Sequence, residues 1–340
     1  MARTRARRGT GYAIVAALVM ACAPATAPSS PGDSAGASPS AGSASAAPTP
    51  GPLAIGTWRE AARLPGARSE VGAAALDDRL YVAGGFGVHR DTVDTFEAYD
   101  LASNSWVELA PLPERRDHLA LAALDGAIYA SGGGILGLGL ISDALWRYDP
   151  ASDRWTTLAP MPARRKAHAL VPLDGRLYAV GGVIRGADRQ AIAVYDPATN
   201  AWDATRAPAP SLREHVAGVA FDGRVWLIGG RWSSNLGTVE AYDPETNAWT
   251  RMPDLPTPRG GLTAAVVDGK IHVTGGEFDR GTFPQHEVWD PAVGSWLRYP
   301  DLPRSRHGVG SGAIDRQWIV AGGGPAPDLS TTDVTEIWSP

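Results

Sequence analysis

The chain has 340 residues and a formal net charge of −5, from 31 Lys and Arg against 36 Asp and Glu, and its single cysteine is Cys22. A general nucleic-acid binder needs a basic surface, so this balance excludes that class, and we expect no nucleic-acid partner. Because no cysteine follows residue 22, disulfides and thiolate metal sites are excluded from the rest of the chain.

The first residues have the features of an export signal. Four arginines within residues 3–8 precede an apolar run over 12–21, which is too short to span a bilayer, and Cys22 follows a small residue. Residues 1–21 are therefore predicted to be a signal peptide. The junction resembles a bacterial lipobox, which implies that Cys22 is lipidated and becomes the new N-terminus. An ordinary signal peptide with an incidental cysteine is the alternative.

Residues 22–53 form a second segment, composed almost entirely of Ala, Ser, Pro, Gly and Thr. Such a composition buries too little apolar surface to fold, so we predict a disordered linker. A linker directly after a lipidated cysteine suits a tethered domain. We therefore expect an exported protein that is anchored at the bacterial cell membrane or envelope through this lipid only, and secretion is the alternative.

Residues 54–340 contain six copies of one unit. Each copy has a glycine doublet that closes a short apolar run, and successive doublets are 46 to 49 residues apart. The first glycines of the doublets are Gly84, Gly132, Gly181, Gly229, Gly275 and Gly322. Periods of this size are typical of radial or solenoid repeats.

Further positions recur inside the unit. An aromatic–Asp pair follows the doublet, as in Tyr99-Asp100, and a tryptophan follows that aromatic seven residues later, as in Trp106. Asp-Gly pairs upstream of four doublets predict tight hairpins, as in Asp125-Gly126. Each unit is therefore predicted to be a four-stranded antiparallel meander.

Together, the doublets, aromatic–Asp pairs and tryptophans resemble those of the kelch-repeat family over about 280 residues. The resemblance implies an all-β fold, a six-bladed kelch-type β-propeller around a central channel. It also implies that the glycines and large aromatics are structural. The loops between blades, and those between the second and third strands of a blade, fall on one face of a meander. We call this the variable face, and we expect it to carry function.

The two ends of the chain are offset by one strand. The sixth unit stops at Trp338-Ser339-Pro340, the equivalent of an aromatic–Asp–Pro triplet, whereas Trp58 matches the tryptophan strand of the other units. We therefore predict that the N-terminal strand completes the last blade. This closure leaves no open sheet edge, and we expect a monomer.

A second repeat lies between the blades. A proline is followed three residues later by an arginine in all six units, always 16 residues before the first doublet glycine; these arginines are Arg68, Arg116, Arg165, Arg213, Arg259 and Arg306. We predict a ring of arginines around one mouth of the channel, which suits an anionic ligand. The kelch adaptor that senses oxidative stress binds acidic peptide side chains with arginines at this position, which implies the same role. The alternative is structural, with the arginines bonding a neighbouring backbone and being neutralised by nearby acids such as Glu70 and Glu277.

Two histidines accompany the arginines. His118 and His215 each lie two residues after a ring arginine and are predicted to face the channel, so we include them among the ligand-binding candidates. Two histidines from different blades are too few to predict a metal site, and we predict none. No cofactor motif is present, and we expect no cofactor.

Three functional classes suit this sequence. The first is a non-catalytic binding module of the cell envelope that recognises a protein, peptide or glycan, anionic ligands included, through its variable face. The second is a secreted carbohydrate-active enzyme of the sialic-acid mutarotase type, with acid–base groups drawn from Glu70, Glu214 or Glu277. The third is a structural scaffold of an envelope assembly. Of the three we expect the binding module.

Overall fold

The computed structural model describes residues 52–136, 138–185 and 192–340. The predicted signal peptide over 1–21, the candidate lipidation site Cys22 and all but the last two residues of the predicted linker lie outside the described residues. Every regular element within the described ranges is a β-strand. Those ranges contain no helix long and apolar enough to cross a membrane.

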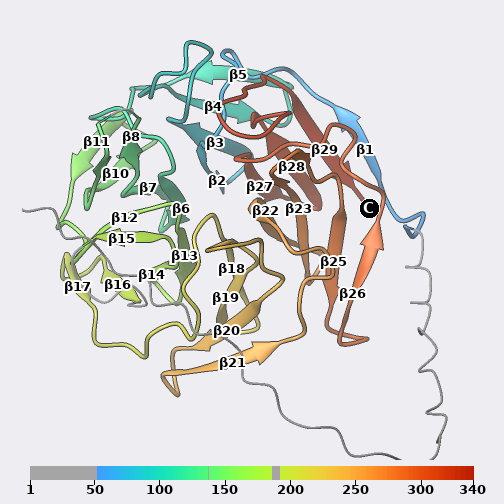
Figure 1. Ribbon diagram of the computed structural model, residues 1–340. Helices are drawn as coiled ribbons and strands as arrows, with labels where there is room; N and C mark the ends of the chain where they lie inside the picture. Colours follow the sequence, from blue (N-terminus) through green and yellow to red (C-terminus); the bar gives the residue numbers. More distant parts are fainter. Residues whose placement is uncertain (1–51, 137, 186–191) are drawn as a thin grey trace, which may run out of the picture. The chain divides into compact units, whose positions relative to one another are not determined.

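Six antiparallel sheets follow one another along the chain and are arranged as the blades of a ring (Figure 1). The first blade contains β2 (Gly72–Leu76), β3 (Arg79–Ala83), β4 (Phe96–Asp100) and β5 (Ser105–Glu108). The second contains β6 (Ala120–Leu124), β7 (Ala127–Ser131), β10 (Leu145–Asp149) and β11 (Arg154–Thr157). The third contains β13 (Ala169–Leu173), β14 (Arg176–Val180), β16 (Ala193–Asp196) and β17 (Ala201–Asp203).

The remaining blades have the same order. The fourth contains β18 (Ala217–Phe221), β19 (Arg224–Ile228), β20 (Val239–Asp243) and β21 (Ala248–Met252). The fifth contains β22 (Gly260–Val267), β23 (Lys270–Phe278), β25 (His286–Asp290) and β26 (Ser295–Tyr299). The sixth contains β27 (Gly310–Ile314), β28 (Gln317–Ala321), β29 (Thr335–Ser339) and, from the other end of the chain, β1 (Thr57–Glu60).

The N-terminal strand closes the ring as predicted. β1 pairs antiparallel with β29, and Trp58 lies opposite Trp338 in the register. The Trp58 indole Nε1 donates a hydrogen bond to the carbonyl oxygen of Pro300 in the fifth blade, at 2.9 Å. The two ends of the chain are thus joined without a covalent bond, and the sixth blade has the same four strands as the others.

Two-residue turns join the first and second strands of the blades, and four of these turns are Asp-Gly pairs. At Asp125-Gly126 both residues have positive φ, 49° and 71°, as type I′ hairpins require. The other three Asp-Gly turns have the same conformation. These residues therefore form the hairpins predicted from the sequence.

Large aromatic side chains fasten each blade to the one before it. The indole of Trp106 lies 5.3 Å from the buried ring of Tyr99, and its Nε1 donates to the Ala62 carbonyl at 2.8 Å. All six tryptophans at this position make the equivalent bond to the preceding blade, at 2.8–3.1 Å. Burial of these rings between blades gives them the structural role that was expected.

The loops between the second and third strands carry the irregular structure. A small hairpin of β8 (Gly134–Ile135) and β9 (Leu140–Ile141) extends from the second blade. In the third blade β12 (Arg164–Lys166) pairs with β15 (Val183–Arg185), and in the fifth β24 (Gly281–Thr282) pairs with the end of β23. Differences between blades are therefore concentrated on the variable face.

Candidate functional site

The six arginines of the Pro-x-x-Arg motif lie inside the blades. Each is at most 6 % exposed, and four of them are among the largest fully buried side chains of the protein. Their guanidinium groups are therefore not presented at the surface of the channel mouth, where the sequence placed them. We call this set the arginine layer; it consists of Arg68, Arg116, Arg165, Arg213, Arg259 and Arg306.

Buried carboxylates pair with four members of the arginine layer. Each comes from the third strand of the same blade, two residues before the aromatic of the aromatic–Asp pair. The pairs are Arg68 with Glu97, Arg213 with Glu240, Arg259 with Glu287 and Arg306 with Glu336. Burial lowers the pKa of Arg213 to about 10, with Glu240 acting in the opposite direction, so this guanidinium stays charged at neutral pH.

The second and third blades use other partners. At the glutamate position the second blade has Trp146, and the Arg116 guanidinium lies over its ring, 5.3 Å from the centroid. Arg116 also pairs with Glu114, an exposed residue of its own loop. In the third blade Arg165 Nη1 donates to the Gly181 carbonyl at 2.7 Å. Every member of the layer is thus engaged within its own blade.

The backbone of the arginine layer joins neighbouring blades. The carbonyl of each arginine accepts a hydrogen bond from the second glycine of the preceding doublet, at 2.7–2.9 Å in all six cases. A Cβ atom on Gly84 would lie 2.3 Å from the Arg116 carbonyl oxygen, so this position requires glycine. The constant spacing of arginine and doublet is therefore a consequence of one joint repeated six times. These contacts favour a structural role, but the side-chain partners lie in the same blade and the neutralising acids are not Glu70 and Glu277, as the structural alternative expected. Ligand binding by the arginine layer stays a prediction.

Two residues after each arginine the chain makes a left-handed turn toward the next blade. All six residues at this position have φ between 51° and 72°. The N–H of His118 donates to the Glu70 carbonyl at 3.0 Å, and the same bond recurs from blade to blade as far as Gly308. We call these positions the turn ring; its members are Glu70, His118, Ala167, His215, Gly261 and Gly308.

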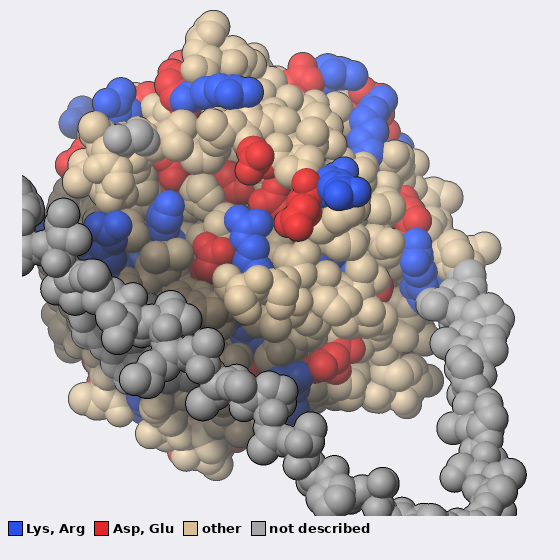
Figure 2. All heavy atoms as spheres, in the orientation of Figure 1, with Lys and Arg blue, Asp and Glu red and all other residues tan. Residues whose placement is uncertain are grey.

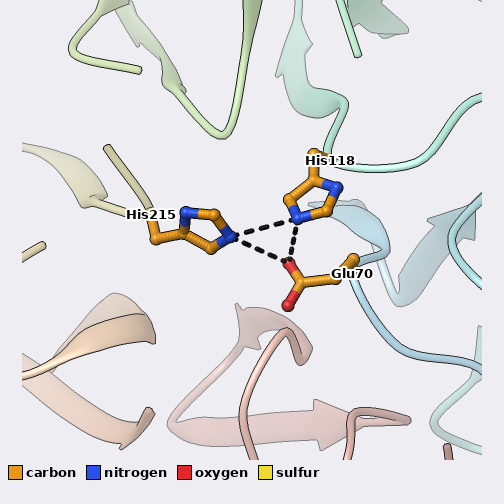
Figure 3. A group of neighbouring side chains, drawn as sticks. All are labelled: Glu70, His118 and His215. Atoms are coloured by element: carbon orange, nitrogen blue, oxygen red, sulfur yellow. Dashed lines mark hydrogen bonds and ion pairs between the residues drawn. The ribbon is translucent and has the colours of Figure 1, made fainter. Parts of the chain in front are cut away.

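Three side chains of the turn ring meet in the channel mouth (Figure 3). The Nε2 atoms of His118 and His215 lie 3.1 Å apart. Glu70 Oε2 lies 3.4 Å from His118 Nε2 and 4.0 Å from His215 Nε2. The three residues come from different blades, and all three side chains are largely buried. The two histidines predicted to face the channel therefore do so, with a carboxylate between them.

An acidic residue precedes each histidine and fixes its orientation. His118 Nδ1 lies 2.8 Å from Asp117 Oδ1, and His215 Nδ1 contacts Glu214 Oε2. Burial would raise the pKa of Glu214, but His215 and Arg231 lower it to about 2. The pKa of Asp117 is also below its ordinary value, because His118 outweighs the effect of burial. Both acids are therefore ionised, and both Nδ1 atoms must donate.

Glu70 and His118 shift the pKa of each other. Burial opposes the charge on Glu70, yet the histidines and Arg231 around it hold its pKa below the ordinary value. Burial likewise opposes charge on His118, while Glu70 and Asp117 raise the pKa of its ring above the ordinary value. The centre of the mouth is thus an environment in which a carboxylate is stabilised by positive charge directly beside it.

Further charged side chains contact these three residues. Arg231 donates through Nε to Glu214 at 2.9 Å and through Nη1 to Glu277 at 2.6 Å, and its Nη2 lies 3.1 Å from His215 Nε2. His307 Nε2 lies 3.4 Å from Glu277 Oε2 and 3.5 Å from Glu70 Oε1. We call Glu70, His118 and His215, together with Arg231, Glu277 and His307, the mouth cluster.

Two cavities on the variable face meet beside this cluster. One, of about 600 Å³, is bordered by the exposed rings of Trp232 and Phe278. The other, of about 450 Å³, has Glu70, His118 and His215 at its base. Its wall is apolar and includes Phe86, Ile135, Leu136, Leu140 and Leu329. Both cavities share Arg231, Glu277 and Asp328, so they form two lobes of one depression.

The surface charge around the depression is mixed. Its lining includes the acidic residues Glu277 and Asp328 and the basic residues Lys166, Arg185 and Arg231. Figure 2 shows acidic and basic side chains interspersed on the visible face, without a continuous field of either sign. Burial of the arginine layer therefore removes the basic ring on which an anionic ligand was predicted.

Part of the site was missed from the sequence. Glu70 was considered as a charge that could neutralise the arginines and as one of three acid–base candidates, but it was not grouped with the histidines, although it has the same two-residue offset from an arginine as His118 and His215. That constant offset was the available signal. Arg231 and His307 reach the cluster from positions outside the turn ring. His307 directly follows Arg306 in the sequence, whereas Arg231 lies in a loop without a repeated spacing.

Comparisons with known proteins agree with the repeat and the blades. The family model of the KLHDC2/KLHL20/DRC7 Kelch-repeats domain matches residues 167–338, just over half of the chain, and the Kelch motif matches residues 67–113 and 115–162. Kelch-like ECH-associated protein 1B of Danio rerio is 40 % identical over 47 residues, which are 14 % of this chain and 8 % of that protein. The solved structure of YjhT superposes with a TM-score of 0.69 and 20 % identity, over 80 % of this chain and 95 % of that one. The chain spans less than a tenth of the Danio rerio relative, and the likeness to YjhT shows the fold alone.

Proposed function

The chain belongs to the kelch-repeat family, a family of β-propellers that suits binding, and on that premise we propose that it is a non-catalytic binding module of the cell envelope. Its ligand is an extended peptide segment of a partner protein, held across the variable face. The observation that carries this proposal is the two-lobed depression centred on Arg231, Glu277 and Asp328.

The depression has the chemistry of a peptide site. Its smaller lobe, about 450 Å³, is within the range of ligand pockets and combines an apolar wall with a polar base. Leu140 in that wall is 50 % exposed, and Trp232 in the other lobe is 48 % exposed. Exposed aromatic and aliphatic side chains around a few polar groups are typical of interface anchors. We therefore propose an amphipathic segment, since no basic ring is accessible to attract an acidic one.

Envelope display rests on the predicted lipidation of Cys22. A flexible coil of about 30 residues reaches on the order of 30 Å, which would separate the propeller from a lipid anchor. Membrane fractionation of cells that express the wild type and Cys22→Ala tests this part of the proposal. We expect the variant to leave the membrane fraction, and unchanged partitioning would exclude the anchor.

A peptide-display selection tests the binding site. Random peptides are selected on the full-length chain, and the affinity of each selected peptide is measured for Trp232→Ala and Leu140→Asp. We expect each substitution to weaken binding by about tenfold or more, as for anchors at interface centres. The matched control is Val293→Asp, because Val293 is 62 % exposed and lies in a turn on the opposite face.

The outcomes separate the functional classes. Peptides whose binding is lost in both site variants and kept in the control support the peptide site. Equal loss in Val293→Asp would contradict it. A glycan array that yields a ligand dependent on Trp232, where peptide selection yields none, would replace the peptide with a glycan.

A second candidate function rests on the mouth cluster. Glu70 Oε2 and His118 Nε2, 3.4 Å apart at the base of the smaller lobe, form an acid–base pair, and anomer exchange of a carboxylated sugar requires such groups. An enzyme of the mutarotase type predicts faster anomer exchange of N-acetylneuraminate by NMR, lost in Glu70→Gln. A rate equal to that of buffer would remove this candidate.

A further inference from the structure

Three atoms with lone pairs converge in the mouth of the channel. His118 donates its Nδ1–H to Asp117, and His215 donates its Nδ1–H to Glu214. When both rings are neutral, their Nε2 atoms therefore carry lone pairs, and these atoms face each other across 3.1 Å. Glu70 Oε2 beside them is also an acceptor. Buried acceptors at this separation repel one another unless a positive centre lies among them, either protons or a cation. Arg231 Nη2 meets one of them, His215 Nε2, from the side at 3.1 Å.

The spacing of the three atoms fits a metal ion. Their separations are 3.1, 3.4 and 4.0 Å. The circle through such a triangle has a radius of about 2.1 Å, so a point exists at that distance from all three atoms, which is the length of a Zn–N or Zn–O bond. The same three residues, Glu70, His118 and His215, form a group whose ligand atoms lie within 4.8 Å of one another.

The surroundings also have the features of a metal centre. In metal sites the second nitrogen of a histidine ligand almost always donates to a carboxylate, a backbone carbonyl or water, which fixes the ring and makes the ligand more basic. Asp117 and Glu214 do this for the two histidines here. Asp117 is held in turn by the Thr92 hydroxyl at 2.6 Å and by the Leu136 N–H at 3.0 Å.

A neighbouring group of possible ligands lacks these features. Glu70, Glu277 and His307 also lie within ligand distance of one another. However, His307 Nδ1 and Nε2 lie 3.1 Å from the carbonyl oxygens of Gly324 and Asp328, so His307 is oriented as a hydrogen-bond donor. Arg231 Nη2, 3.1 Å from His215 Nε2, is the internal competitor for a metal ion. A bound ion replaces this one contact, while Arg231 keeps its pairs with Glu214 and Glu277.

We propose that the protein binds one divalent transition-metal ion of the Zn²⁺ type through Glu70, His118 and His215. Two histidines and one carboxylate leave coordination positions open, and these face the cavity of about 450 Å³. A bound ion accordingly presents a Lewis-acidic position to whatever ligand enters the depression. The ion replaces the protons that otherwise hold the three side chains together. This site does not depend on the peptide ligand proposed above.

Calorimetric titration with Zn²⁺ tests the site directly. The full-length chain is stripped with a chelator and carries no histidine tag. We expect one equivalent of Zn²⁺ to bind, and the double variant His118→Ala with His215→Ala to show no binding at this site. Asp117→Asn and Glu214→Gln retain all three ligands, and we expect each to weaken the affinity by about 10- to 100-fold.

Three further variants keep the test decisive. His89→Ala removes an exposed histidine of the first blade, and His307→Asn removes the alternative ligand; we expect unchanged Zn²⁺ affinity in the first and one equivalent of Zn²⁺ still bound in the second. Ala167→His adds a fourth ligand on the turn ring between the two histidines, and we expect tighter binding, a gain that misfolding cannot imitate. Zn²⁺ bound equally by the double histidine variant would overturn the proposal, as would binding lost in His307→Asn alone. If no selected peptide depends on Trp232 and Leu140 while Zn²⁺ still binds as expected, only the proposed function is contradicted.

Discussion

The arginine layer and the turn ring lie two residues apart in every unit, yet their side chains differ in almost every respect. The layer has the same residue six times, inside the blade, engaged by carboxylate, carbonyl or aromatic partners. The ring has four residue types at six positions, with a shared backbone conformation and side chains directed into the channel. In this propeller the repeated side chain holds the blades, and the variable side chain beside it is available for chemistry. The following predictions test that difference, from the largest expected effect to the smallest.

Arg259→Met should have the largest effect on stability. The substitution leaves Glu287 buried without its guanidinium partner, which typically costs about 3–5 kcal/mol of unfolding free energy. Chemical denaturation measures the change. The double variant Arg259→Met with Glu287→Leu should recover much of it, because no uncompensated charge then remains. A loss below about 1 kcal/mol in the single variant would show that the layer does not hold the blades.

The acid stability of the protein should depend on His168, three residues after Arg165. Burial, with Arg165 nearby, holds the pKa of this ring well below 6.5, so the folded protein keeps it neutral. The unfolded chain protonates the same ring below pH 6.5, and stability is therefore lost as the pH falls from that value, by about 1.4 kcal/mol per unit.

Comparison of His168→Val with the wild type isolates this effect. The equivalent positions of the other blades carry valine or leucine, as at Val71 and Leu119, so valine fits the site. The difference in unfolding free energy, variant minus wild type, should be about 2 kcal/mol larger at pH 5 than at pH 7. Chemical denaturation at both pH values measures it. Parallel pH profiles would show that His168 takes up no proton on unfolding.

Arg116→Met should cost less than Arg259→Met. The carboxylate partner of Arg116 is Glu114, whose side chain is 63 % exposed and is rehydrated when the pair is lost. What remains is the contact with Trp146, with one hydrogen bond each to the Arg115 carbonyl and the Ser142 hydroxyl, and cation–π contacts contribute about 0.5–2 kcal/mol. Equal losses in the two variants, by the same denaturation measurement, would show that buried pairing does not set the strength of the layer.

His118→Ala should have the smallest effect on stability. Alanine already stands at the equivalent position of the third blade, Ala167, with φ of 52° in both cases. We expect the unfolding free energy to change by less than about 1 kcal/mol, because the turn and its backbone hydrogen bond are retained. Glu70 and Asp117 line the same cavity as His118, so water replaces the imidazole beside these two carboxylates. A loss as large as that of Arg259→Met would mean that the ring is structural too.

The blades were predictable because their signals repeat. Doublet, aromatic–Asp pair and tryptophan recur at fixed distances, and offset ends such as Trp58 and Trp338 predict the closing strand. The position of the arginines along the chain was predicted in the same way. Their burial was not, although a glutamate two residues before the aromatic, such as Glu287, signals a buried partner in four blades.

The mouth cluster was predicted only in part, for a physical reason. His118 and His215 share an offset from the arginines, but their separation across the channel depends on ring closure and on the left-handed turns. Arg231 reaches His215 from a loop whose conformation no repeat determines. Contacts between blades at non-repeating positions are therefore the part of the structure that sequence periodicity does not contain.

Thermal unfolding with and without Zn²⁺ tests both halves of the comparison in one measurement. A ligand at about 100 times its Kd stabilises the folded state by about 2.7 kcal/mol, which gives a measurable rise in the Tm. Arg259→Met should unfold at a lower temperature than the wild type and keep the rise with Zn²⁺. The double variant His118→Ala with His215→Ala should unfold close to the wild-type midpoint and lose the rise. The reverse result, an Arg259 variant without the Zn²⁺ effect and a histidine variant that retains it, would contradict the assignment of structure to the layer and chemistry to the ring.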